Sequence, residues 1–128
     1  MPLLNFKEQF VEPIRSGRKH HTIRATRAIP VKRGDNLYLY TGLRHKGAFR
    51  ILADPVVCTQ VQIIYIEIDD NKFEMEIIVD GHILESDEID RLVIADGFKS
   101  FPEFSEFWMK NHGVKGRVDF KGQIIHWK

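Results

Sequence analysis

The sequence is poor in cysteine and has neither a long apolar run nor a large net charge. Cys58 is the only cysteine among 128 residues, which excludes an intramolecular disulfide and a cysteine-rich zinc site. No stretch approaches the roughly 18 uninterrupted apolar residues of a membrane-spanning helix, and the first residues lack the basic and apolar segments of an export signal. We therefore expect a cytoplasmic protein with no membrane partner.

The composition is that of an ordinary globular domain. Hydrophobic residues make up 43% of the chain and charged residues 29%, so disorder is not expected. No repeat, low-complexity tract or linker divides the sequence, and a chain of this length buries roughly two-thirds of the surface that it exposes when unfolded. We predict a single domain over residues 1–128.

The near-zero net charge conceals an uneven distribution. Residues 1–60 contain 11 lysines and arginines against 4 acidic residues, and the stretch from Arg15 to Arg33 contains no acid at all. A basic face formed by this half would attract phosphate groups. The alternative is that the two halves interleave in space and their fields cancel.

Hydrophobic periodicity and turn residues predict both helices and strands. Apolar spacing indicates a helix over residues 6–14 that closes at Ser16 and Gly17, with Pro13 shortening or kinking it. Two further helices are predicted over residues 87–95 and 100–113, the second beginning with a capping box at Ser100. Strands are predicted over residues 3–6, 36–41, 49–68 with an interruption at Asp54 and Pro55, 73–79, 117–120 and 123–127.

The order of these elements bears on the fold class. Helices and strands do not alternate as they would in βαβ units, which favours an α+β fold, namely a small mixed β-barrel with helices inserted between its strands or packed over them. Periodicity alone does not distinguish a barrel from a sandwich.

The segment from Gly17 to Arg24 is the densest group of candidate functional residues. If its second half is extended, Thr22 and Arg24 point to the same side, because side chains alternate along a strand. Lys19 precedes them, and cationic neighbours together with partial burial would make its amine a usable base or nucleophile. The alternative is a basic loop whose charges face solvent or phosphate.

Other reactive residue types carry weaker signals. The six histidines show no metal-ligand spacing, so we expect no metal and no cofactor. Cys58 lies in an apolar strand and is interpreted as a buried hydrophobic residue. Tyr38 and Tyr40 are candidates for stacking on a base, whereas the aromatic residues of the last helix are interpreted as core.

Asp96 is an isolated carboxylate at a predicted helix end. Such a residue is most often a simple cap or turn residue, and it gains functional interest only if the fold brings it to Lys19.

Several of these residues together resemble a known family. A helix ending in Ser-Gly, then Gly17, Lys19 and Arg24 at fixed spacing, and Lys32-x-Gly34-Asp35 before a strand are similar to the ASCH domain family of the PUA-like superfamily. The family motif is GxKxxExR, and here Thr22 replaces the glutamate. The later Ala95-Asp96-Gly97-Phe98 segment is also similar to an acidic-Gly-Phe segment that many members carry.

The resemblance implies a fold and an activity. It implies a PUA-like β-barrel of five to six strands with flanking helices and a cleft lined by the motif. Small bacterial members with threonine in the motif are amidohydrolases that act on N(4)-acetylcytidine with a lysine, a threonine and a glutamate. Lys19 and Thr22 match the first two, and the third position falls on Asp96, whose side chain is shorter by one methylene, or roughly 1 Å.

Three functions remain open at this point. In the first, Lys19, Thr22 and Asp96 hydrolyse an N-acylated cytidine. In the second, the protein is an RNA-binding module without catalysis, and the third is a ribonuclease. For any of them, the residues expected to contact the nucleoside or RNA are Gly17, Arg18, Arg24, Arg27, Lys32, Arg33, Tyr38 and Tyr40.

Overall fold

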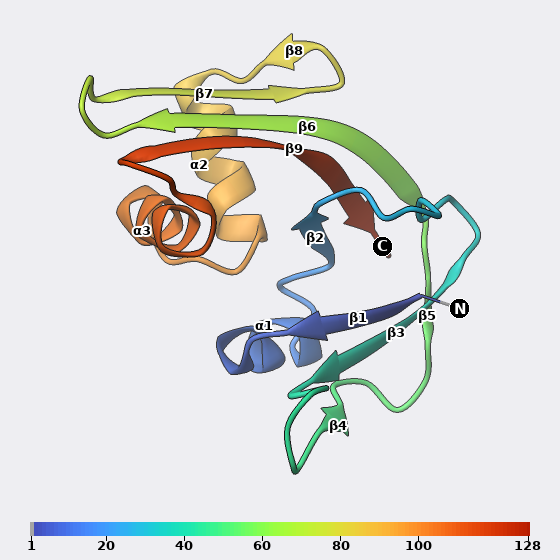
Figure 1. Ribbon diagram of the computed structural model, residues 1–128. Coiled ribbons are helices and arrows are strands. Elements are labelled where there is room, and N and C mark those ends of the chain that lie inside the picture. Colours follow the sequence, from blue (N-terminus) through green and yellow to red (C-terminus); the bar gives the residue numbers. More distant parts are fainter. Residues whose placement is uncertain (1) are drawn as a thin grey trace.

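A computed structural model describes residues 2–128 as an α+β fold in which nine strands form two sheets beside three helices (Figure 1). The strands are β1 (Leu3–Phe6), β2 (His21–Arg24), β3 (Asn36–Thr41), β4 (Phe49–Arg50), β5 (Val56–Val57), β6 (Gln60–Asp69), β7 (Glu74–Val79), β8 (His82–Ile83) and β9 (Arg117–His126). The helices are α1 (Val11–Arg15), which follows a 3-10 turn (Glu8–Phe10), α2 (Ser86–Ala95) and α3 (Phe101–His112).

The first sheet is mixed and is centred on β3. Strand β1 pairs with β3 in parallel, while β4 and β5 pair with β3 in antiparallel fashion. Leu37, Leu39 and Thr41 are buried and alternate with half-buried tyrosines, as the sequence predicted for this strand. The sheet therefore presents one apolar face to the core.

The second sheet is antiparallel, in the order β2-β9-β6-β7-β8. Strands β6 and β9 pair along their full length, from Gln60 opposite His126 to Asp69 opposite Arg117. Ile64, Ile66 and Ile68 face the core, whereas Ile63 and Tyr65 are exposed on the other face. This period of two fixes which side of the sheet the helices cover.

Helices α2 and α3 lie on one side of the second sheet (Figure 1). The ring of Trp108 on α3 packs against that of Phe120 on β9, with centroids 4.7 Å apart. Helix α3 begins at the predicted cap, with the Ser100 side chain accepting a hydrogen bond from the Glu103 amide and proline in the first turn. The predicted capping box is only half formed, because the Glu103 side chain accepts from the Lys99 amide rather than from the Ser100 amide. None of the helices in residues 2–128 has the length and apolar character of a membrane-spanning segment.

The two sheets do not join into a closed barrel in the part of the chain described. Strand β1 is the outermost strand of the first sheet and β2 that of the second, and no backbone ladder links them. Arginine side chains span this gap: Arg24 donates to the carbonyl oxygen of Asn5, and Arg27 donates to that of Leu3. The opening between β1 and β2 is where the candidate site lies.

Three predicted elements differ from the structure. The strand expected over residues 49–68 is divided into β4, β5 and β6, with irregular chain at residues 51–55 and 58–59 between them. The helix expected over residues 6–14 is a 3-10 turn and five helical residues, because β1 extends through Phe6 and leaves little chain before Gly17. The two strand pieces expected around Gly122 are one continuous strand, β9. Gly122 does not break the strand. It allows the carbonyl oxygen of Arg24 to approach so closely that an added Cβ would lie 2.2 Å from it.

We expect Gly122→Ala to destabilise the fold by about 1–3 kcal/mol, because backbone of β2 cannot move aside as a flexible side chain could. Urea unfolding measures this cost. Lys121→Ala, at the exposed neighbouring position of the same strand, is the control and should change stability by no more than about 0.5 kcal/mol. Equal costs for the two variants would contradict the close-approach argument.

Candidate functional site

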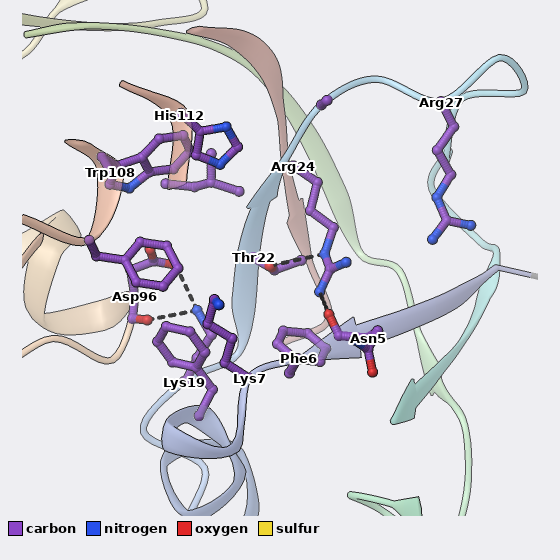
Figure 2. A pocket seen from close by; sticks show the side chains of 14 residues that line it. Asn5, Phe6, Lys7, Lys19, Thr22, Arg24, Arg27, Asp96, Trp108 and His112 are labelled. Atoms are coloured by element: carbon purple, nitrogen blue, oxygen red, sulfur yellow. Dashed lines mark hydrogen bonds and ion pairs between the residues drawn. The ribbon is translucent and has the colours of Figure 1, made fainter. Parts of the chain in front are cut away.

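A cavity of about 370 Å³ opens between β1, β2 and α3 (Figure 2). This volume is in the range of small-molecule sites. Its lining combines charged residues, aromatic rings and a few neutral polar and aliphatic groups: Lys7, Lys19, Arg24, Arg27 and Asp96; Phe6, Phe10, Phe107, Trp108 and His112; and Asn5, Thr22, Ile23 and Ala25.

Lys19 is positioned by the turn that ends α1. Gly17 has φ +84°, a left-handed conformation that lets the chain reverse after the helix. The Lys19 amide then donates to the carbonyl oxygen of Pro13, 2.9 Å away, which fixes the start of the side chain. The side chain runs inward and only 2% of the residue is exposed.

Asp96 is positioned by the end of α2. It is the residue at which the helix stops, and Gly97, with φ +99°, turns the chain away. A Cβ on Gly97 would lie 3.2 Å from the Phe10 ring and 3.3 Å from Cδ of Lys19. Glycine at position 97 therefore allows both the left-handed backbone conformation and the close approach of the Lys19 side chain.

Lys19 and Asp96, 77 residues apart in sequence, meet at the base of the cavity. Lys19 Nζ donates to the backbone carbonyl and to Oδ1 of Asp96, each at 2.7 Å. The carbonyl belongs to a helix C-terminus, where a cation is favoured. Asp96 thus reaches Lys19 although its side chain is shorter than glutamate, which resolves the question raised by the sequence.

The two hydrogen bonds leave one tetrahedral position of Nζ without a hydrogen-bond partner in the described part of the chain. In the ammonium form this position holds the third proton, and in the neutral amine it holds the lone pair. The centre of the Phe10 ring lies 4.8 Å from Nζ, which is a cation–π contact for the ammonium form. A neutral Lys19 could therefore accept a proton while Asp96 holds it in place.

Burial and charge shift the pKa values of this pair. Burial lowers the pKa of Lys19 below its usual value of 10.5, more than the negative charge of Asp96 raises it, and the positive charge of Arg24 lowers it further. Burial by itself would raise the pKa of Asp96, but Lys19 and His21 outweigh it and hold that pKa below its usual value. Asp96 is thus ionised, and Lys19 releases its proton more readily than an exposed lysine does.

His21 is a contact of Asp96 that the sequence analysis did not single out. Its Nε2 lies 3.2 Å from Oδ1 of Asp96, the same oxygen that Lys19 contacts, but it makes no hydrogen bond within residues 2–128. The ring of His126 packs against that of His21, with centroids 5.4 Å apart, and its Nε2 lies 2.7 Å from Oε1 of Gln62. The buried ring of His21 next to Asp96 and the half-buried ring of His126 therefore pack together.

Thr22 and Arg24 point to the same side of β2, as predicted from strand alternation. Arg24 Nε donates to Oγ1 of Thr22 at 3.3 Å, and its guanidinium lies 4.5 Å from the centre of the Phe6 ring. Because Oγ1 accepts this bond, the Thr22 hydroxyl proton is free to donate to a ligand. Burial first and the charge of Arg27 second lower the pKa of Arg24 to about 10, so the arginine remains charged at neutral pH.

The remaining predicted binding residues lie outside the cavity lining. Gly17 acts through the backbone turn, and Arg18 is exposed and pairs with Glu12. Lys32 and Arg33 are exposed in the loop before β3. The rings of Tyr38 and Tyr40 are on β3, where the guanidinium of Arg50 lies 5.9 Å and 5.8 Å from their centres. Of the seven basic residues from Arg15 to Arg33, three therefore line the cavity, namely Lys19, Arg24 and Arg27, and the other four do not.

Sequence reasoning also missed part of the aromatic wall. Phe107 and Trp108 were assigned to the helix core, and they do pack there, but both also line the cavity. His112, one turn further along α3, stacks on Trp108 with centroids 4.6 Å apart. The one available signal was the spacing of Trp108 and His112, which places both on the same face of a helix.

No three histidine, cysteine, aspartate or glutamate side chains come together as a metal-binding group among residues 2–128. Comparison with known proteins adds no family: no family model, curated protein or solved structure matches the chain. The functional argument therefore rests on the residues and their geometry.

We expect Lys19→Met to cost about 3–5 kcal/mol of stability, because it leaves the Asp96 carboxylate buried without its partner. Urea unfolding at pH 7 measures the loss. Arg91→Met breaks the exposed Arg91–Asp87 pair on α2 and should cost at most about 1 kcal/mol. If both substitutions cost the same, Lys19 and Asp96 do not form a buried ion pair.

The lowered pKa of His126 leads us to expect a loss of folding stability in mild acid. Burial and the neighbouring histidines lower the pKa of His126 to about 4, against an ordinary value of 6.5. Between these values the unfolded chain binds a proton that the folded chain does not, so stability falls as pH decreases from about 6.5 to 4. His126→Gln should reduce this fall, measured by urea unfolding at several pH values, whereas His45→Gln, in an exposed loop, should not. An unchanged pH dependence in His126→Gln would contradict the assignment.

Proposed function

We propose that the protein is an ASCH-type amidohydrolase that binds a pyrimidine nucleoside in this cavity and removes an acyl group from the exocyclic amine, as in N(4)-acetylcytidine. On this proposal the two sheets are a PUA-like arrangement that is open between β1 and β2. The observation that carries it is the buried Lys19 amine, held by two bonds to Asp96 and placed beside Thr22 at the base of a cavity.

The cavity suits a planar, polar ligand. His112 and Phe107 provide aromatic surface on which a pyrimidine can stack, and the buried ring of Trp108 packs against His112 and supports it. In Figure 2, Lys19 lies below Trp108 in the view and Thr22 and Arg24 lie beside it, and these polar groups would meet the substituents of the ring. A cavity of about 370 Å³ favours a single nucleoside over an extended strand.

Neutral Lys19 would act as the general base. It accepts a proton from water as the water oxygen forms a bond to the amide carbon, and the Thr22 hydroxyl donates to the resulting oxyanion. The carbon–nitrogen bond then breaks, and the Lys19 ammonium returns its proton to the leaving nitrogen. The products are the free amine and a carboxylic acid, and Asp96 remains ionised and keeps Nζ oriented throughout.

Hydrolysis of N(4)-acetylcytidine, followed by chromatography of the released cytidine, tests the proposal. Thr22→Val preserves the Lys19–Asp96 pair and should lower kcat by about 10²–10³-fold. Because Lys19→Met alone endangers the fold, Lys19→Met combined with Asp96→Leu removes both charges and should abolish turnover while the protein remains folded by circular dichroism. Lys72→Met, on the distant β6–β7 turn, is the control for a lysine change and should retain activity.

Absence of turnover in the wild-type protein would overturn the proposal. If the same protein bound single-stranded RNA in a salt-dependent manner, the non-catalytic RNA-binding function would take its place. Cleavage of that RNA would instead identify a ribonuclease.

The pH profile provides a further prediction for the base. Activity should rise with pH through the pKa of Lys19, which burial holds below 10.5, because only the neutral amine accepts a proton. The positive charge of Arg24 contributes to this lowering, so Arg24→Gln should move the rising limb of kcat to higher pH. If the rising part of the kcat–pH profile of Arg24→Gln stays in place or moves to lower pH, a group other than Lys19 controls it.

A further inference from the structure

The cavity carries more positive charge than the proposed hydrolysis uses. Lys19 is neutralised by Asp96, which is the only acidic residue among the described residues of the lining. Arg24, Arg27 and Lys7 remain. A neutral nucleoside would leave these three charges without a counterpart.

The partners of the two arginines do not cancel their charge. Arg24 donates to the carbonyl of Asn5 and to the Thr22 hydroxyl, and Arg27 donates to the carbonyl of Leu3. All of these acceptors are neutral. Neither guanidinium forms an ion pair with a carboxylate anywhere in residues 2–128.

The pKa of Arg24 is affected by this excess of positive charge in the cavity. After burial, the charge of Arg27 is the largest influence that lowers the pKa of Arg24, and it outweighs the opposing effect of Asp96. An anion close to these guanidinium groups would oppose this effect, and a charged acceptor strengthens the hydrogen bonds that a guanidinium donates.

The charged groups also lie in a definite order across the cavity. Figure 2 shows Lys19 and Asp96 on one side, Thr22 and Arg24 in the middle, and Arg27 on the far side. A nucleotide has the same succession of parts: a base with its exocyclic amine, a ribose, and a phosphate. A phosphate monoester carries a charge of about −1.5 to −2 at neutral pH, which matches two guanidinium groups.

We infer that the ligand is a nucleoside 5′-monophosphate, with its phosphate held by Arg24 and Arg27 and its base directed to Lys19. This inference rests on the proposed function for the position of the base, but the phosphate site stands on the arginines alone. Arg27 is then the specificity-determining residue that distinguishes a nucleotide from a nucleoside.

Calorimetric titration with cytidine 5′-monophosphate and with cytidine tests the inference without requiring turnover. We expect the monophosphate to bind at least about tenfold more tightly to the wild-type protein at low salt. Arg27→Gln should bring its affinity to within about twofold of the affinity for cytidine measured on the same variant. Lys72→Gln removes an exposed positive charge elsewhere and should preserve the preference.

The other possible results test the phosphate site and the proposed hydrolysis separately. Equal binding of the two ligands, or no binding of either, would overturn the phosphate site, and hydrolysis of N(4)-acetylcytidine would then decide the proposed function by itself. A preference for the monophosphate without hydrolysis of either acetylated form would support the phosphate site and refute the hydrolase. A short single-stranded oligonucleotide that bound more tightly than the monophosphate would overturn the free nucleotide in favour of RNA.

Discussion

The contact between Lys19 and Asp96 is the interaction on which the arrangement of the site depends. It joins the turn after α1 to the end of α2, two segments that no strand pairing connects. Its geometry requires Gly17 to reverse the chain before the lysine and Gly97 to allow the close approach after the aspartate. Without this ion pair, α2 would present a buried carboxylate to an apolar environment.

The same contact explains how a lysine can be both buried and chemically useful. Burial disfavours the ammonium, and Asp96 opposes this effect, so the amine is neither permanently charged nor free to move. The carboxylate oxygen that Lys19 contacts also lies 3.2 Å from Nε2 of His21. Stability and reactivity therefore have a common origin here, since the groups that hold Lys19 in place also set the ease with which it loses a proton.

Much of the local structure could be predicted from the sequence, whereas the assembly of the site could not. Alternation along β3 and β2 and the Ser100 cap are local patterns, and each was predicted correctly. The meeting of Lys19 with Asp96 depends on how α2 docks, which no local pattern encodes. Trp108 was assigned to the core because one helical face can both pack and line a cavity, and His21 was missed because its role exists only relative to Asp96.

The arginines that bridge the two sheets have a consequence for solubility. Strand β1 pairs with β3 on one side only, and its other side would offer unpaired carbonyl groups to any extended chain that met it. Arg24 and Arg27 donate hydrogen bonds to the carbonyl oxygens of Asn5 and Leu3, and they place two positive charges along this edge of β1. These two side chains protect the edge of β1 from edge-to-edge aggregation. A second copy of the protein would have to displace both arginine side chains before one of its strands could pair with β1.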